Sequence, residues 1–220
     1  MTMPLSAAIL KRIAFLCPKR WDRCYTLMKL ATDPVYAAVG KELGGSTLPV
    51  LDVGCGIGLL AFYLRESGFT QDISGFDYDE KKISSARAMA VSGGYEGLSF
   101  MAGDARSGLP EFSGHVVILD ILQFFKREEQ AALLKAAAAR VAEGGRLIIR
   151  TGLQDDSTRF HVTVIGDWVA RLTLWMKEAP VCYPDGELFR SVLGNAGLKV
   201  CVKPLWGGTP FNNHLVVAER

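Results

Sequence analysis

The sequence predicts an α/β protein built on a doubly wound, mostly parallel β-sheet. Between residues 50 and 150, short apolar segments of strand length alternate with longer segments of helical periodicity. At residues 50–64 a strand, a glycine-rich turn and a helix follow one another directly, which is typical of a ligand-binding junction in such sheets. Glycines also follow the helical segments, as they do at helix ends: Gly68, the pair Gly93 and Gly94, and the pair Gly144 and Gly145.

The alternation assigns the elements in turn. We expect strands at residues 50–53, 73–77, 98–101, 116–120 and 146–150, and helices near residues 59–67, 79–92 and 127–142. Asp79 is expected to cap the second of these helices. A wide apolar helix comes next, because its apolar residues, from Phe160 to Met176, form a face broad enough for burial on two sides. Asp185 can cap a last helix that ends near Gly197, before two strands at residues 200–202 and 215–218.

Three helices are expected before the first strand. Apolar residues recur at helical spacing over residues 5–16 and 21–28, and Thr32 or Asp33 can cap a third helix with Pro34 at its first position. Residues 1–42 contain seven Lys or Arg and three Asp or Glu. We therefore expect a basic helical cap at residues 1–45 and a main domain at residues 46–220. A solvated helix face, a cap over a substrate pocket and peripheral contact with a membrane all fit this composition.

The composition narrows the class of protein. A chain of 220 residues, 49% of them hydrophobic, can bury a core for one domain with an appendage. Its net charge of +2 does not by itself indicate a nucleic-acid-binding protein. The cysteines are scattered, without the close pairs of a zinc site, and no apolar segment approaches membrane-spanning length. We therefore expect a cytoplasmic protein in a reducing compartment.

The turn at residues 54–58 is the most informative stretch. Its three glycines permit a sharp turn and the close approach of a ligand to the backbone. Two ligands compete for it. Gly56, Gly58 and Ala61 fit the fingerprint of a dinucleotide, which would make the chain an NAD(P)-dependent oxidoreductase. Asp52 favours the other ligand, because a carboxylate suits the ammonium group of S-adenosyl-L-methionine and would repel a pyrophosphate.

Three motifs resemble those of class I S-adenosylmethionine-dependent methyltransferases. Residues 51–58 (LDVGCGIG) are similar to the first motif of the family, residues 75–79 (GFDYD) to the end of its second strand, and residues 103–105 (GDA) to its adenine-binding motif. The resemblance covers roughly residues 45–150, and Glu143 stands where the family usually has proline. It implies a seven-stranded Rossmann-like methyltransferase fold with an antiparallel last strand. The intact motifs disfavour a scaffold without activity.

The resemblance also implies which residues bind the cofactor, S-adenosyl-L-methionine. An acidic residue at the end of the second strand, Asp77, would hold the ribose hydroxyls, and Asp104 would meet the adenine amino group. The full set that we expect in the cofactor site is Asp52, Gly54, Cys55, Gly56, Gly58, Asp77, Tyr78, Asp104 and Ala105.

The catalytic residues are less clearly marked. Asp120 ends the fourth strand, at the edge of the sheet where ligands bind, and Gln123 stands where many relatives have histidine. A phenolic acceptor, with a pKa of about 10, would gain from a base that titrates near neutrality. His161 and His214 are the two candidates, because His115 precedes the fourth strand and should be structural. Beyond the cofactor residues there is no compact cluster of carboxylates and histidines, so we expect no metal.

A looser resemblance concerns the acceptor. Residues 29–36 (KLATDPVY) and 209–214 (TPFNNH) are similar to segments of bacterial methyltransferases encoded with aryl-polyene pigment synthesis. This implies methylation of an aryl hydroxyl on a chain carried by acyl carrier protein. Trp168, Trp175 and the N-terminal helices are expected to shape a pocket for this small or elongated hydrophobic acceptor. Because carrier proteins are acidic, a basic cluster is a candidate contact: Lys11, Arg12, Lys19, Arg20 and Arg23.

Overall fold

The computed structural model describes residues 5–172 and 180–220, without the side chains of residues 167–172. The chain divides into two compact units, one ending at Ser107 and the other beginning at Gly108, and each is described by itself. Trp175 and the side chain of Trp168, both expected at the acceptor, lie outside the described residues.

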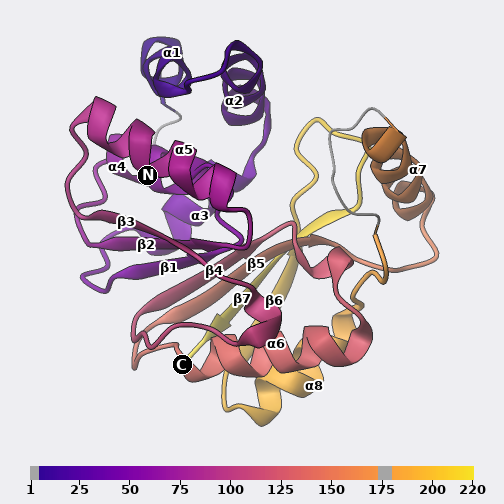
Figure 1. Ribbon diagram of the computed structural model, residues 1–220. Coiled ribbons are helices and arrows are strands. Elements are labelled where there is room, and N and C mark those ends of the chain that lie inside the picture. The colour runs from indigo at the N-terminus through magenta and orange to yellow at the C-terminus, as the bar shows by residue number, and fades with distance from the viewer. Residues whose placement is uncertain (1–4, 173–179) are drawn as a thin grey trace. The chain divides into compact units, whose positions relative to one another are not determined.

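Seven strands form one sheet: β1 (Val50–Val53), β2 (Ile73–Asp77), β3 (Leu98–Ala102), β4 (His115–Leu119), β5 (Arg146–Gly152), β6 (Lys199–Pro204) and β7 (Asn213–Glu219). Their order is β3-β2-β1-β4-β5-β7-β6 (Figure 1). β1 is parallel to β2, β2 to β3 and β4 to β5, whereas β7 runs antiparallel to both β5 and β6. The prediction of a doubly wound, seven-stranded, mostly parallel sheet is confirmed.

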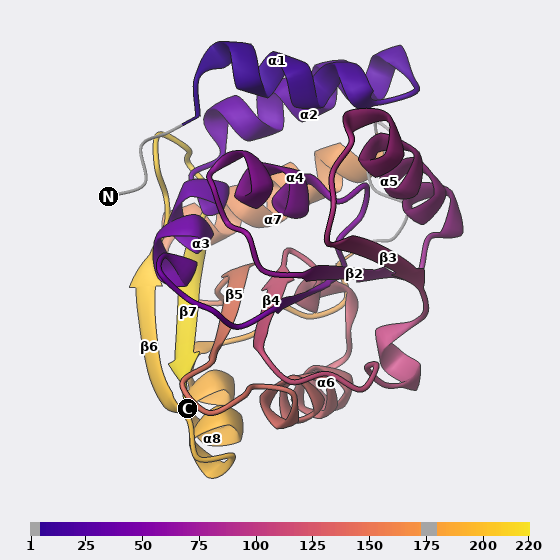
Figure 2. The same cartoon turned by 90° about the vertical axis from the view of Figure 1, so that its left-hand side faces the viewer.

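The helices described in the first unit are α1 (Ala7–Leu16), α2 (Arg20–Thr32), α3 (Val35–Leu43), α4 (Leu59–Glu66) and α5 (Glu80–Gly93). In two views at right angles, α1 and α2 lie side by side, outside α4 and α5 (Figures 1 and 2). Arg12 of α1 forms an ion pair with Glu66 of α4, and the Sγ atom of Cys17 lies 3.2 Å from Oγ1 of Thr26 in α2. The ion pair thus joins α1 to α4, and the contact of Cys17 joins the end of α1 to α2.

The helices described in the second unit are α6 (Arg127–Ala139), α7 (Thr158–Leu172) and α8 (Gly186–Asn195). α6 and α8 pack against each other on one side of the strands of this unit (Figure 1). β4 and β5 are buried along most of their length, as their continuous apolar sequences predict. α6 ends earlier than expected, because Val141 leaves the helix to form a parallel bridge with Gly114.

Two of the three predicted helix caps are confirmed. Side-chain oxygens of Asp79 and Asp185 accept hydrogen bonds from backbone N–H groups in the first turns of α5 and α8. α3 begins one residue later than expected: Pro34 stands at the cap position and Val35 is the first helical residue, while the Oδ1 atom of Asp33 accepts from the N–H of Val35 at 3.0 Å. Thr32 is instead the last residue of α2, where its hydroxyl donates to a carbonyl one turn earlier. None of the helices in the described part of the chain has the length and apolar character needed to cross a bilayer.

Candidate functional site

The glycine-rich turn joins β1 to α4 through three left-handed residues. The φ angles of Gly54, Gly56 and Gly58 are 79°, 57° and 80°, which only glycine adopts without strain. The N–H groups of Gly54 and Cys55 both donate to the carbonyl of Phe76, at 2.6 and 3.2 Å. The end of β2 therefore fixes the path of this turn.

Two phenylalanine rings give a second reason for glycine, at Gly58 in the turn and at two glycines outside it. A Cβ atom at Gly58 would lie 2.7 Å from the ring of Phe100, and one at Gly75 would lie 2.5 Å from the same ring. A Cβ at Gly103 would lie 2.5 Å from the ring of Phe76. Both rings are buried. The three sequence motifs thus meet in the first unit through glycine and phenylalanine packing.

Asp77 ties the turn to the end of β2. The residue is 6% exposed, and its Oδ2 atom accepts a hydrogen bond from the N–H of Gly56 at 2.8 Å. Its Oδ1 atom accepts from the N–H of Asp79, also at 2.8 Å. Tyr78 lies between these two residues and is half exposed. Each carboxylate oxygen has a second lone pair, so Asp77 can accept further hydrogen bonds from a ligand.

A second carboxylate, that of Asp52, is buried behind the turn. It lies in β1 and is only 2% exposed. Burial and the neighbouring charge of Asp77 raise the pKa of Asp52 to about 7. Burial, with smaller contributions from the same two carboxylates, raises the pKa of the Cys55 thiol. The local field therefore favours a cationic group over an anionic one.

Asp104 and Ala105 follow β3, next to the end of β2. The N–H of Gly103 donates to the carbonyl of Asp77 at 3.0 Å, which places Asp104 one strand away from Asp77. Its Oδ1 atom accepts from the N–H of Arg106 at 2.9 Å, and Ala105 opens a short 3₁₀ helix. All nine residues predicted for the cofactor therefore belong to the first unit.

Lys82 is a neighbour of the turn that the sequence analysis missed. Its Cδ atom lies 4.0 Å from the position that a Cβ at Gly56 would occupy. The lysine is exposed on the first turn of α5. Its place five residues after Asp77 was readable in the sequence, but a lysine there is equally compatible with a solvated helix face.

In the second unit, Asp120 adopts an unusual backbone conformation at the end of β4. Its φ angle is 57°, and it is the only non-glycine residue with positive φ in the described chain. Its Oδ1 atom lies 2.8 Å from Nη1 of Arg150, and its N–H donates to the carbonyl of Arg150 at 2.9 Å. Arg150 is buried, and the sequence analysis did not identify it. The ion pair suits a positioning role for Asp120 better than proton abstraction.

The backbone of Gln123 binds the segment at residues 181–182, and its side chain is buried. Its carbonyl accepts from the N–H groups of Val181 and Cys182, at 2.7 and 3.3 Å. Its side chain is 9% exposed, and the Oε1 atom has no hydrogen-bond partner among the described residues. Gln130 strengthens the attachment, because its Nε2 atom donates to the carbonyl of Cys182 at 2.8 Å.

The candidate histidines differ in their surroundings. The Nδ1 atom of His214 lies 3.1 Å from the carbonyl oxygen of Asn212, and its half-buried ring stands edge-on to Trp206. A carbonyl only accepts, so in the neutral ring Nδ1 carries the proton and Nε2 is the acceptor. His161 is exposed, and its Nδ1 atom lies 3.0 Å from the carbonyl of Ser157, one turn earlier in the chain.

Asn212 fixes the segment that precedes His214. It is 1% exposed, and its Nδ2 atom donates to the carbonyl of Leu153 at 2.9 Å and to Oδ2 of Asp155 at 2.8 Å. Its N–H donates to the hydroxyl of Thr163 at 2.7 Å. His115, in contrast, is buried at the start of β4, where its Nδ1 accepts from a backbone N–H, as a structural histidine should.

Comparison with known proteins identifies the family. The family described as methyltransferase domain matches residues 45–177. The structure of magnesium protoporphyrin IX methyltransferase ChlM from Synechocystis PCC 6803, with bound SAH, is similar with a TM-score of 0.66 at 19% identity, covering 95% of this chain and 93% of that chain. The mitomycin 7-O-methyltransferase MmcR is similar with a TM-score of 0.68 at 17% identity, covering 95% and 60% of the two chains.

An O-methyltransferase family protein from Burkholderia thailandensis gives a TM-score of 0.65 at 21% identity, over 100% of this chain and 65% of that chain. The chain thus spans less than two thirds of the length of both O-methyltransferases. No curated protein sequence matches it.

The family match extends over more than half of the chain and includes the glycine-rich turn, Asp77 and Asp104. The comparisons give no support to the alternative of an NAD(P)-dependent oxidoreductase. The chain therefore belongs to the methyltransferase-domain family and is a class I methyltransferase that uses S-adenosylmethionine as its cofactor.

Proposed function

We propose that this methyltransferase transfers the methyl group of S-adenosylmethionine to a hydroxyl oxygen of a small or elongated hydrophobic, phenolic acceptor. The observation that carries the cofactor site is the pair of buried carboxylates, Asp52 and Asp77, at a turn of left-handed glycines. O-methylation is supported by the two O-methyltransferases among the structural neighbours.

The described residues fit S-adenosylmethionine group by group. The ammonium would lie near Asp52 and Gly54, where a cation relieves the repulsion between the two carboxylates. The ribose hydroxyls would donate to Asp77, and the adenine would meet Tyr78, Asp104 and Ala105. A dinucleotide fits less well, because its pyrophosphate would approach the same two carboxylates, against which Lys82 beside Gly56 supplies a single positive charge. When bound, S-adenosylmethionine supplies an electrophilic methyl group, so the protein has mainly to align the acceptor and remove its proton.

His214 is our preferred base for the acceptor hydroxyl. Its Nδ1 contact with the Asn212 carbonyl leaves Nε2 as the acceptor, and the hydrogen bonds of Asn212 hold that carbonyl in place. His161 is the second candidate, but its contact with Ser157 and its exposure fit a residue at the start of a helix. For Asp120 we propose that the ion pair with Arg150 orients the backbone beside the acceptor.

A hydrophobic acceptor is supported by the packing of the N-terminal helices. Together with Tyr63 of α4 they border an open pocket of about 180 Å³, lined mainly by apolar residues that include Leu10, Leu30 and Pro34, with Thr32 and Asp33 as its polar part. This volume is enough for a benzene-sized group. We propose on this basis that residues 1–45 form a cap that binds part of the acceptor, and that residues 46–220 bind the cofactor.

Delivery of the acceptor by an acyl carrier protein, as in aryl-polyene synthesis, remains a prediction. Its candidate contact consists of three exposed basic residues: Lys11 in α1, Lys19 just before α2 and Arg20 at the start of α2. Reversing these charges should slow methylation of a carrier-bound phenol at low salt and leave a free phenol unaffected. Equal loss on both substrates would contradict carrier recognition.

The proposed reaction can be tested with matched acceptors. Alkyl 4-hydroxybenzoates of increasing chain length are incubated with the enzyme and methyl-labelled S-adenosylmethionine, with the corresponding 4-amino compounds as controls. We expect label on the phenolic oxygen, turnover that rises with chain length, and no loss of turnover with a metal chelator. Label on the amino group alone would contradict O-methylation. Loss of turnover with chelator would contradict the expectation that no metal takes part.

A further inference from the structure

The second helix exposes an apolar stripe. Trp21 is 68% exposed and Met28 is 66% exposed, and Cys24 and Ala31 are exposed as well. These residues recur at spacings of three and four, so they lie along one face of α2. The opposite face is buried through Thr26 and Leu30, among others. α2 therefore presents apolar side chains to solvent as well as to the core, which is uncommon for a surface helix.

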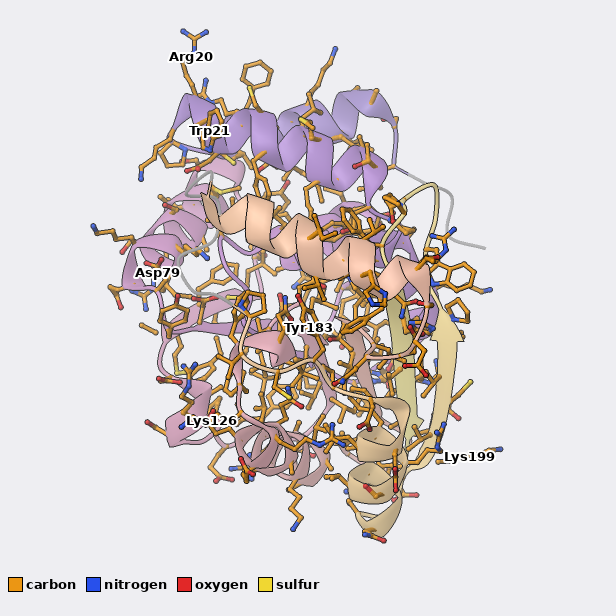
Figure 3. All side chains as sticks on the ribbon, turned by 90° about the vertical axis from the view of Figure 1, so that its right-hand side faces the viewer. Arg20, Trp21, Asp79, Lys126, Tyr183 and Lys199 are labelled. Atoms are coloured by element: carbon orange, nitrogen blue, oxygen red, sulfur yellow. The ribbon has the colours of Figure 1, made fainter. Side chains whose placement is uncertain are left out.

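Exposed positive charges surround the start of this stripe. Lys19 and Arg20 begin α2, and Figure 3 shows Arg20 extending away from the ribbon, with Trp21 beside it. On α1, Lys11 is exposed, and Phe15 is 68% exposed. We call the set of Lys11, Phe15, Lys19, Arg20, Trp21 and Met28 the α1–α2 face.

Contacts of two neighbouring arginines help to fix the backbone that carries the α1–α2 face. Arg12 is ion-paired with Glu66 of α4. Arg23 donates to the carbonyl of Cys17 at 2.9 Å and lies over the Phe15 ring, 5.6 Å from its centroid. The backbone of this face is therefore ordered before binding, so little backbone order has to be gained on docking.

We propose that the α1–α2 face docks on the surface of a lipid bilayer that contains anionic lipids. Tryptophan and phenylalanine reside favourably at the boundary between headgroups and acyl chains, and lysine and arginine are attracted to anionic headgroups. Both classes of side chain are exposed on this helix pair. An acidic carrier protein would pair with the cations, but charge pairing alone leaves Trp21 and Met28 in water. A bilayer accommodates both, and it requires no helix long enough to span it.

Vesicle co-sedimentation tests this proposal with the full chain. The vesicles are either pure phosphatidylcholine or phosphatidylcholine with about a quarter phosphatidylglycerol, at low and high salt. We expect binding to the anionic vesicles that is at least about tenfold tighter than to the neutral ones and that weakens as salt rises. Equal binding to both vesicles, or binding to neither, would overturn the proposal.

Matched variants distinguish binding through the α1–α2 face from non-specific binding by any exposed apolar residue. Trp21→Ser combined with Met28→Ser should weaken binding to anionic vesicles by at least about tenfold, because both apolar contacts are lost. Val91→Ser is the control, since Val91 is 83% exposed on α5 and should not alter binding. Circular dichroism and S-adenosylhomocysteine binding must be unchanged in both variants, which also keeps this test independent of the proposed reaction. Loss of vesicle binding in Val91→Ser alone, or salt-sensitive binding to an acidic carrier protein without any vesicle binding, would contradict the bilayer assignment.

Discussion

The carboxylate of Asp77 accepts a hydrogen bond from the backbone N–H of Gly56 at 2.8 Å, so the end of β2 holds the turn that follows β1. A second hydrogen bond, from the N–H of Asp79, orients the same carboxylate. The residue proposed to hold the cofactor's ribose thus also fixes the backbone beside which the cofactor would lie. Binding and local stability are coupled at this one side chain.

The first prediction concerns the space available for a side chain at Gly58. Gly58→Ala should destabilise the protein by about 2–5 kcal/mol, because a left-handed alanine costs about 1–2 kcal/mol and overpacking costs about 1–3 kcal/mol more. Its Cβ would lie 2.7 Å from the Phe100 ring. Gly94→Ala is the matched control, since Gly94 has a φ of 64° but nothing within 4 Å of the added Cβ. Urea denaturation measures both. Equal losses in the two variants would show that packing against Phe100 contributes nothing.

The second prediction concerns the pH dependence that Asp52 imposes. Its pKa is raised from 3.8 to about 7, so between these values the folded state holds a proton that the unfolded state has released. Stability should therefore fall as pH rises through this window, by roughly 4 kcal/mol in total. Asp52→Asn should flatten the curve and be more stable than the wild type above neutral pH. Denaturation at several pH values checks this, and parallel curves for the two proteins would contradict it.

Asp52 should also make cofactor affinity depend on pH. The ionised carboxylate attracts the ammonium group, so S-adenosylmethionine should bind more tightly as pH rises through about 7. Asp52→Asn should bind more weakly at pH 8 and lose most of this dependence. An affinity that is independent of pH in the wild type would place the ammonium elsewhere.

The third prediction separates the two histidines. His214→Ala should lower kcat for a phenolic acceptor by at least about tenfold, and His161→Ala should change it little, because only His214 has its ring oriented by a buried segment. The measurement is kcat over a range of pH for each variant. If neither variant loses about tenfold, neither histidine is the general base.

The fourth prediction concerns the anchor of His214. Asn212→Ala removes hydrogen bonds to Leu153 and to the carboxylate of Asp155, which should cost about 2–4 kcal/mol of stability. Asn213→Ala is the control. The side chain of Asn213 is only partly buried, so its removal should cost less than about 1 kcal/mol of stability. Similar losses for both asparagines would mean that the buried network around Asn212 contributes little.

The features that the sequence predicted well depend on neighbours along the chain. The helix caps of Asp79 and Asp185 and the left-handed glycines of the turn follow from short-range hydrogen bonding and backbone sterics. The alternation of strands and helices was likewise readable from periodicity, and the resemblance supplied the antiparallel β7. Local chemistry thus determines most of the architecture.

The features that were missed depend on residues far apart in sequence. The ion pair of Asp120 with Arg150 joins the end of β4 to β5. The residues next to Asp120 in the sequence do not predict its positive φ. Gln130 reaches Cys182 across 52 positions, and Asn212 reaches Asp155 across 57. Each of these polar side chains, read alone, is indistinguishable from a solvated residue. Only the folded chain shows that they are buried or partly buried and bonded.

The cofactor site is tested most directly by calorimetric titration of S-adenosylhomocysteine into the wild type and Asp77→Asn, with NAD⁺ as the competing ligand. We predict that the wild type binds S-adenosylhomocysteine and not NAD⁺, and that the folded Asp77→Asn variant loses roughly 1.5–3 kcal/mol of binding free energy, the usual value of hydrogen bonds to a charged acceptor. Unchanged affinity in the folded variant, or binding of NAD⁺ in place of S-adenosylhomocysteine, would contradict the assignment of Asp77 and of the glycine-rich turn to the cofactor.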